Sequence, residues 1–465
     1  MGVACRKASS LARPLAFDMA DAALRIVAIM SRDTASLAAL EKQSPLSPAV
    51  SDLVYRGLRH WGLAQVRLAR MANQAPEIKI SALLAIAWAA MHERMREPYV
   101  LLDQAVNAAK RLVGQKPAGF VNALLRNTVR DPQAVEDFEN PVAKWNAPLW
   151  WIEKIQRDWG EQASDVLAAL QVRAPLTVRL AGGLEAHIES YLEQLAAQGL
   201  SGRVLGPAAV SIEPAVSVDR IPGFAQGQAC VQDASAQQAA NLFDDLLARG
   251  QASQGRPTVL DACAAPGGKA IALAQRHAAD VWALDSSSAR LGRLKADLPR
   301  VLPTLKGHIH PVNGDVLSPA HWPETMPRQF DAILLDAPCS ASGVSRRHPE
   351  IAWKRTPEEI AAVADTQRKM LDVLWARLKP GGELAFVTCS VFREEGETQA
   401  QLFLDRTSDA RALPCAGRLL PMASPQTGHN QDGFFFAKFK KVSGTVGLAA
   451  VDHNCVHNTA PGIGQ

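Results

Sequence analysis

The stretch VLDACAAPGGKA, residues 259–270, decides the fold of the C-terminal half of this chain. A short apolar run that ends in a glycine-rich turn and leads into a helix is typical of the first strand and loop of a parallel α/β sheet. Further apolar runs follow and alternate with helical patterns, which favours a doubly wound Rossmann-like sheet. The predicted strands are 258–261, 281–285, 309–312, 332–336 and 383–388, and the predicted helices lie near 269–278, 287–297, 357–378 and 395–405.

The glycine-rich loop indicates a ligand at the edge of this sheet. It has neither the G-x-G-x-x-G spacing of a dinucleotide fold nor the G-x-x-x-x-G-K-[ST] spacing of a P-loop. Gly267 and Gly268 allow a close backbone approach, and the following helix offers free amides to a carboxylate. Asp285 ends the second predicted strand, where an acid can hold ribose hydroxyls, and Asp315 follows the third. Each acid alone is more often a turn residue, but together they predict an S-adenosylmethionine pocket.

Two cysteines follow predicted strands. Cys339 comes three residues after Asp336, and Cys389 follows the strand in ELAFVTCS, so both thiols should lie at the same edge of the sheet. An isolated free cysteine is more often a small buried hydrophobe. Beside a methyl-donor pocket, however, the two strand-end thiols are candidate nucleophiles. The remaining cysteines outside the glycine-rich loop are interpreted as ordinary residues: Cys5, Cys230, Cys415 and Cys455.

Thiols fit one kind of methyl transfer. Carbon 5 of a pyrimidine is too weakly nucleophilic to accept a sulfonium methyl group, but addition of a thiolate to carbon 6 converts the ring into an enamine-like nucleophile. An acid or donor at ring nitrogen 3, such as Asp336, would increase the electron demand of the ring. A second base or thiol must then assist elimination. The residues therefore predict carbon methylation of a flipped or single-stranded pyrimidine.

The motifs resemble those of a known family. CAAPGGK (263–269), DAPCSASGV (336–344), RRHPEIAW (346–353) and TCS (388–390) are similar to the signature of the RNA cytosine-5 methyltransferases of the nucleolar-protein/Sun family, Sun/Fmu type. GFVNALLRN (119–127) is similar to the NusB-like RNA-binding domain. That fusion is characteristic of the members that act on bacterial 16S ribosomal RNA, and the resemblance extends over nearly the whole chain.

The resemblance implies a role for each matching residue. Cys389 would be the nucleophile that attacks carbon 6, and Cys339 would assist release of the product. Asp336 would lie between donor and cytosine. Lys269 would reach toward the reacting groups, or would merely neutralise Asp336. The residues expected to bind S-adenosylmethionine are Cys263, Ala264, Ala265, Pro266, Gly267, Gly268, Lys269, Asp285, Asp315 and Asp336.

The N-terminal half has helical periodicity. Residues 47–71 place apolar side chains at spacings of three and four, which predicts one long helix. Further helices are expected at 18–31, 76–92, 98–113 and 117–130, so we predict an all-helical NusB-like bundle. A strand at 176–180, a helix at 185–198 and a β-rich segment at 210–218 predict a small α+β insert, in which Ala181 replaces the asparagine usual in the family. The expected domain limits are 1–17 (disordered tail), 18–140 (NusB-like RNA-binding bundle), 141–170 (helical connector), 171–232 (small α+β RNA-binding insert), 233–441 (Rossmann-like methyltransferase) and 442–465 (disordered tail).

The charge of the chain does not identify a partner. The formal net charge of +4 over 465 residues is too small to indicate a nucleic-acid binder. Residues 1–140 carry 18 Lys+Arg against 13 Asp+Glu, which favours an RNA-facing surface there no more than an ordinary solvated one. Arg346 and Arg347 are candidate phosphate contacts, although each could be plain surface.

The cysteine pattern and the hydropathy limit the class of protein. The seven cysteines include no C-x-x-C pair, which argues against a disulfide framework or a zinc site and for a reducing cytosol. The longest apolar stretch, residues 82–91, is about half a membrane span and predicts a buried helix. We expect a cytoplasmic, monomeric enzyme without a metal that acts on 16S ribosomal RNA before full subunit assembly. Two alternatives stay open: the same reaction on transfer RNA or another ribosomal site, and a non-catalytic ribosome-assembly factor that binds RNA.

Overall fold

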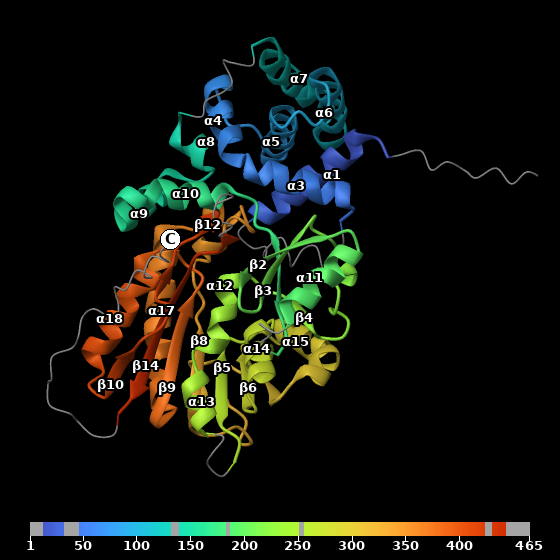
Figure 1. The fold of residues 1–465 in the computed structure, drawn as a ribbon. Helices are drawn as coiled ribbons and strands as arrows, with labels where there is room; N and C mark the ends of the chain where they lie inside the picture. The colour runs from blue at the N-terminus through green and yellow to red at the C-terminus, as the bar shows by residue number, and fades with distance from the viewer. Residues whose placement is uncertain are drawn as a thin grey trace, which may run out of the picture. The chain divides into compact units, whose positions relative to one another are not determined.

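The structure is a computed structural model that describes residues 13–31, 46–131, 139–182, 187–250, 255–423 and 430–442. The chain divides into two compact units, Met1–Lys154 with His348–Lys354, and Ile155–Arg347 with Arg355–Gln465 (Figure 1). Residues 1–12 and 443–465 of the two predicted tails, with Cys5 and Cys455, lie outside the described residues. The predicted domain limits stay a prediction.

The first unit is a helical bundle, as predicted. α5 is its central helix and is buried on all sides from Ile80 to Ala90, because it contacts α1, α3, α4, α6 and α7. Within the described ranges, no helix is both long enough and apolar enough to span a membrane. The helices are α1 (Leu15–Met30), α3 (Pro48–Arg59), α4 (Trp61–Met71), α5 (Ile78–His92), α6 (Pro98–Val113), α7 (Gln115–Arg130) and α8 (Pro141–Trp145).

The single helix predicted at 47–71 is wrong, because α3 and α4 are separated at His60. The side chain of Asn146 causes the break. Its Oδ1 accepts from the Gly62 amide at 2.7 Å and its Nδ2 donates to the Leu58 carbonyl at 2.9 Å. Those are the two backbone groups that would bond to each other in a continuous helix. The buried asparagine therefore replaces one helical hydrogen bond with two of its own.

The second unit begins with a small α+β part. Helices α9 (Leu149–Trp159) and α10 (Ala163–Gln171) precede an antiparallel sheet of order β2-β3-β1-β4, on which α11 (Ile188–Ala197) packs. The predicted strand at 176–180 is confirmed as β1 (Leu176–Leu180), and the β-rich segment ends early, with β3 at Ala209–Glu213. Sequence analysis missed β2 (Ser201–Gly206) and β4 (Ala229–Val231).

The large sheet of the second unit has the order β10-β14-β9-β8-β5-β6-β7. All five predicted strands are confirmed and are mutually parallel (Figure 1). The sheet is not parallel throughout, however, since β14 pairs antiparallel with β9, and β10 with β14. The strands are β5 (Thr258–Ala262), β6 (Asp280–Asp285), β7 (His308–Asn313), β8 (Phe330–Asp336), β9 (Leu378–Thr388), β10 (Ala410–Leu413) and β14 (Phe434–Lys441), with the short β11 (Arg418–Leu419) beside β14.

Helices cover both faces of this sheet. Successive strand residues alternate between two apolar cores, so that Val259 packs with α14 and Leu260 packs with α17. One core lies under α12 (Ala234–Gln237), α14 (Gly268–Arg276) and α15 (Ser288–Val301), and the other lies under α17 (Pro357–Ala376) and α18 (Glu397–Arg406). Since the five parallel strands point the same way, their carboxyl ends form one edge, and the predicted site residues follow those ends.

Candidate functional site

The loop between β5 and α14 turns sharply at the predicted donor site. Cys263 and Gly267 have φ angles of 65° and 109°, in the left-handed region that favours glycine. A Cβ atom at Gly267 would also overlap the side chain of Leu294 in α15. The Ala264 amide donates to the Leu284 carbonyl at 2.9 Å, which ties the loop to the end of β6. Only glycine therefore fits at position 267 without strain.

Asp285, at the end of β6, holds this loop in place. Its Oδ2 accepts from the Ala265 amide at 3.0 Å, and its Oδ1 accepts from the Ser287 amide at 2.8 Å and from Arg290 Nη2 at 3.0 Å. The carboxylate is almost completely buried. Asp285 thus orients the donor loop, a role that sequence analysis did not include, and its remaining lone pairs could accept from ribose hydroxyls.

Asp315 lies on the same edge but is more open. It follows β7 two residues beyond Asn313, which pairs in register with Asp285. Its side chain is exposed, and its Oδ1 accepts from the Leu317 amide at 2.9 Å. The carboxylate can accept a further donor, such as the exocyclic amine of an adenine, so its predicted role is sterically possible and stays a prediction.

The edge of the sheet has the features that an S-adenosylmethionine site needs. A Cβ atom built at Gly268 would have no neighbour closer than 3.9 Å, so there is open space beside the first amides of α14. Asp261, inside β5, is completely buried beneath this space. Burial, reinforced by the negative charge of Asp336, raises the pKa of Asp261 well above its ordinary value. Sequence analysis missed Asp261, although an acid inside an apolar strand was a usable signal.

Lys269 and Asp336 form an ion pair at the centre of the edge. Lys269 Nζ donates to Asp336 Oδ2 at 2.7 Å, and both side chains are largely shielded from solvent. Burial lowers the pKa of Lys269, but the carboxylate of Asp336 outweighs this effect and the pKa is raised overall. The thiol of Cys389, when ionised, raises it further. Lys269 therefore neutralises Asp336 and is also close enough to Cys389 to stabilise a thiolate there.

The two predicted thiols lie side by side. Cys339 Sγ and Cys389 Sγ are 3.4 Å apart, and the Gly343 amide donates to the Cys389 carbonyl at 2.9 Å. The hydrogen bond with Cys389, followed by burial, raises the pKa of Cys339 well above its ordinary value. Either thiol can be the donor in the contact between the two sulfur atoms, and the raised pKa favours the protonated thiol at Cys339.

A buried glutamate that sequence analysis missed joins the two cysteine loops. Glu395 accepts from the amide of Ser340 at 2.7 Å, from the hydroxyl of Ser340 at 2.5 Å, and from the hydroxyl of Ser390 at 2.6 Å. Ser340 follows Cys339 and Ser390 follows Cys389, so one carboxyl group sets the spacing of both sulfur atoms. A Ser-rich pattern after both cysteines was the available signal, but it did not identify the acceptor.

The prediction that Arg346 and Arg347 contact RNA phosphate is wrong. The Arg346 side chain is fully buried, and its Nε lies 2.5 Å from Asp432 Oδ1. Arg347 Nε lies 2.5 Å from Asp432 Oδ2, and its Nη2 lies 2.8 Å from Asp233 Oδ2. Both guanidinium groups are thus used in ion pairs that hold the segment after Cys339 against β14 and α12. The other described free cysteines are not part of the thiol pair: Cys230, Cys263 and Cys415.

Three families match successive parts of the chain. NusB family matches residues 11–130, the RsmF/B-like ferredoxin-like domain matches 147–219, and 16S rRNA methyltransferase RsmB/F matches 251–440. Ribosomal RNA small subunit methyltransferase B of Xanthomonas campestris is 37% identical over 79% of this chain and 82% of its own. The protein of the same name from Vibrio cholerae is 35% identical over 75% of this chain and 78% of its own.

Solved structures share the fold. The crystal structure of the protein PH0851 superposes with a TM-score of 0.72 at 22% identity, over 93% of this chain and all of that one. The crystal structure of NSun6 from Pyrococcus horikoshii with SFG has a TM-score of 0.51 at 19% identity, over 64% of this chain and 99% of that one. The predicted arrangement of a NusB-like bundle, a small α+β insert and a Rossmann-like methyltransferase fold is therefore confirmed, and the family match describes the insert as ferredoxin-like.

Proposed function

Because the chain belongs to the 16S rRNA methyltransferase RsmB/F family, whose members use S-adenosylmethionine, we propose that it methylates carbon 5 of a cytidine in 16S ribosomal RNA through a covalent adduct with Cys389. The observation that carries this proposal is the 3.4 Å contact between Cys389 and Cys339 at the donor edge of the sheet. Methylation of an exocyclic nitrogen needs no covalent step and gives no reason for a thiol pair here.

The residues fit the methyl donor. The loop from Cys263 to Lys269 and the acids Asp285 and Asp315 would hold S-adenosylmethionine, with its carboxylate at the first amides of α14. S-adenosylmethionine supplies the methyl group that carbon 5 receives. Gly267 and Gly268 leave the backbone free to approach it, and Asp285 keeps the loop in place through the Ala265 amide.

The position of Cys389 at the end of β9 and the nearby Lys269 ammonium group support its proposed role as the nucleophile. The raised pKa of Cys339 favours a protonated thiol there, which makes Cys339 the less suitable attacking group. The sulfur of Cys389 adds to carbon 6 of the cytosine, and the electron pair of the ring double bond moves to carbon 5.

The same pair explains how Cys339 assists release. Once Cys389 has become a thioether, it carries no negative charge and is a poor acceptor, so two causes of the raised pKa of Cys339 disappear. The pKa of Cys339 then falls, so that its own proton can pass to solvent. The Cys339 thiolate accepts the proton of carbon 5, the ring double bond forms again, and the bond between Cys389 and carbon 6 breaks to restore the Cys389 thiolate.

Asp336 and Lys269 position the ring. Asp336 Oδ2 accepts from Lys269, and a proton taken from solvent and held between Oδ1 and ring nitrogen 3 would draw electrons from carbon 6. The cytosine must be unstacked for the thiolate to reach the face of the ring. We therefore propose that the enzyme acts as a monomer in the cytoplasm, on 16S ribosomal RNA before full assembly of the ribosomal subunit.

Bisulfite sequencing tests the proposal. The purified chain, S-adenosylmethionine and protein-free 16S ribosomal RNA should produce a new cytidine that resists bisulfite conversion, and the Cys389→Ala variant should produce none. Transfer RNA incubated in parallel should remain convertible. Incorporation of methyl label without any bisulfite-resistant cytidine would mean that another atom is methylated and would reject the proposal.

A further inference from the structure

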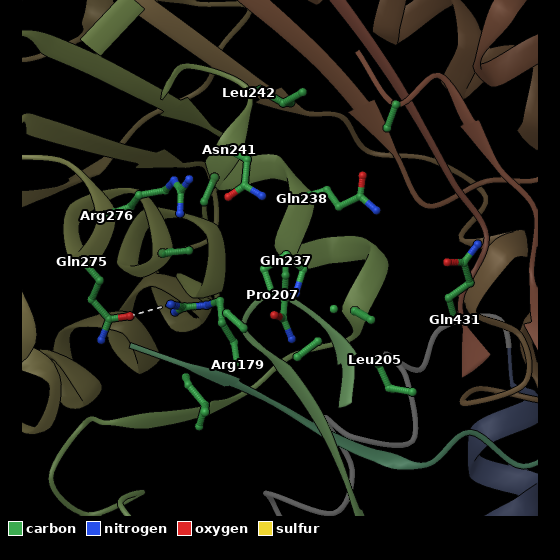
Figure 2. Close-up of a pocket in the computed structure, with 18 of the residues that line it drawn as sticks. Arg179, Leu205, Pro207, Gln237, Gln238, Asn241, Leu242, Gln275, Arg276 and Gln431 are labelled. Atoms are coloured by element: carbon green, nitrogen blue, oxygen red, sulfur yellow. Dashed lines mark hydrogen bonds between the residues drawn. The ribbon is translucent and has the colours of Figure 1, made fainter. Parts of the chain in front are cut away.

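A cavity in the second unit lies outside the proposed methyl-donor site. Its volume is about 720 Å³, which is in the range of sites for nucleotide-sized ligands. β1, the turn between β2 and β3, the segment Gln237–Asn241, α14 and β14 contribute to its walls (Figure 2). None of the thiols or acids assigned to catalysis lines it. The cavity therefore needs an explanation of its own.

The described lining of this cavity is positively charged. Three of its side chains are cationic, namely Arg179, Arg276 and Lys438, and none of the described lining residues is acidic. Arg276 forms a hydrogen-bonded ion pair with Asp244, and Lys438 Nζ lies 3.5 Å from a Glu383 oxygen. Neither acid lines the cavity. Among the described residues, no acid forms an ion pair with Arg179.

Arg179 is nine-tenths buried, with only 6% of its surface exposed. Its Nε donates to Gln232 Oε1 at 2.7 Å, and its Nη1 donates to Gln275 Oε1 at 2.6 Å (Figure 2). Its Nη2 has no hydrogen-bond partner among the described residues. Glutamine oxygens orient the guanidinium group but do not balance its charge, and a buried charge without a counterion is unfavourable. Burial accordingly lowers the pKa of Arg179. Nη2 is therefore a buried donor without a described acceptor, on a side chain that lines the cavity.

The rest of the cavity offers neutral groups that can bind a base. The side chains of Gln238, Asn241 and Gln431 line it, and primary amides pair with the donor and acceptor edges of unstacked bases. We propose that this cavity binds one nucleotide of a single-stranded RNA segment, with a phosphate oxygen on Arg179 Nη2 and the base among these amides. The inference does not depend on methylation at carbon 5. A free nucleotide has the same chemistry, and the experiment separates the two sources.

The first test adds a negative charge to the wall of the cavity. Gln238→Glu is the test variant. The control is Gln198→Glu, which makes the same change of charge at the exposed C-cap residue of α11. Binding of the full-length protein to a labelled single-stranded oligoribonucleotide is measured by fluorescence anisotropy at several salt concentrations. We expect Gln238→Glu to weaken binding about five- to tenfold and Gln198→Glu to leave it unchanged.

The second test removes the guanidinium group. Arg179→Gln should weaken binding of the same oligoribonucleotide and lower the slope of log affinity against log salt by about one, because one phosphate contact is lost. Urea unfolding and S-adenosylmethionine binding verify that the variant is folded. Unchanged affinity and slope in both folded variants would overturn the proposal. Cytidine monophosphate that binds wild type but not Arg179→Gln, with oligoribonucleotide binding unaffected, would instead assign the cavity to a free nucleotide and overturn the RNA assignment.

Discussion

The segment after β8 contains two regions that bury polar groups in opposite ways. Around Arg346 and Arg347, each buried charge is matched by Asp432 or Asp233 at 2.5 to 2.8 Å. Around Cys339, the sulfur faces another sulfur, and the nearby Glu395 has only uncharged donors. The first region is electrically balanced and the second is not. The difference indicates that the arginine region holds the loop in place and that the thiol region keeps its reactivity.

The largest effect should follow from changing Cys389. Cys389→Ala removes the proposed nucleophile, so methylation should fall by at least about 10⁴-fold, while the free energy of unfolding should change little because the thiol is not part of an ion pair. Transfer of label from S-adenosylmethionine to 16S ribosomal RNA measures the loss. Cys230→Ala, at a buried cysteine of β4, is the matched control and should retain turnover. Appreciable activity in Cys389→Ala would mean that the unbalanced region is not the reaction centre.

A substitution of Cys339 should slow release of the methylated RNA rather than the attack of Cys389 on carbon 6. In Cys339→Ser the adduct still forms, but removal of the carbon 5 proton and elimination slow, so turnover should fall about 10²- to 10⁴-fold. Denaturing gels should then show a protein band shifted by bound RNA. The double variant Cys339→Ser with Cys389→Ala is the control and should show no shifted band. A Cys339→Ser variant that lost turnover without a shifted band would assign Cys339 to an earlier step.

A change in the region around Arg346 and Arg347 should lower the stability of the fold rather than the activity. Asp432→Asn leaves two guanidinium groups with one counterion fewer, and breaking such a buried pair costs about 3 to 5 kcal/mol of unfolding free energy. Chemical denaturation measures the cost. Asp365→Asn breaks exposed pairs with Arg368 and Lys369 on α17 and should leave the free energy of unfolding almost unchanged. Equal costs for the two variants would remove the distinction between the regions.

Sequence analysis found the parts of the molecule that local pattern determines. The five parallel strands, the glycine-rich loop and both strand-end thiols follow from apolar runs and from the residues directly after them, so their shared edge could be predicted. β14 and β10 were missed although the apolar run FFFAKFKK of β14 was a usable signal, and their antiparallel pairing with the rest of the sheet is not a local property. The break between α3 and α4 was missed for the same reason, since Asn146 is 84 residues away from Gly62.

The errors at the site have one physical cause. Arg346 and Arg347 looked like phosphate contacts because their counterion, Asp432, is 86 and 85 residues further along the chain. Sequence analysis did not single out Arg179, because the lack of an ion-pair partner among the described residues is visible only in three dimensions. Whether an arginine is structural or available to a ligand therefore depends on partners that local sequence does not identify.

The smallest effect should come from Glu395, and it should depend on pH. Burial raises the pKa of this carboxyl, although hydrogen bonds from Ser340 and Ser390 offset part of the shift. The folded chain therefore keeps the proton to a higher pH than the unfolded chain, and wild-type stability falls as pH rises through that window. Glutamine does not titrate, so the cost of Glu395→Gln, about 1 to 3 kcal/mol near pH 5, should shrink toward pH 8.

Chemical denaturation of both proteins at each pH measures the difference in the free energy of unfolding, with Glu161→Gln at an exposed residue as control. A cost that grew with pH would mean that Glu395 is stabilised as a carboxylate, which would make the thiol region as well balanced as the arginine region.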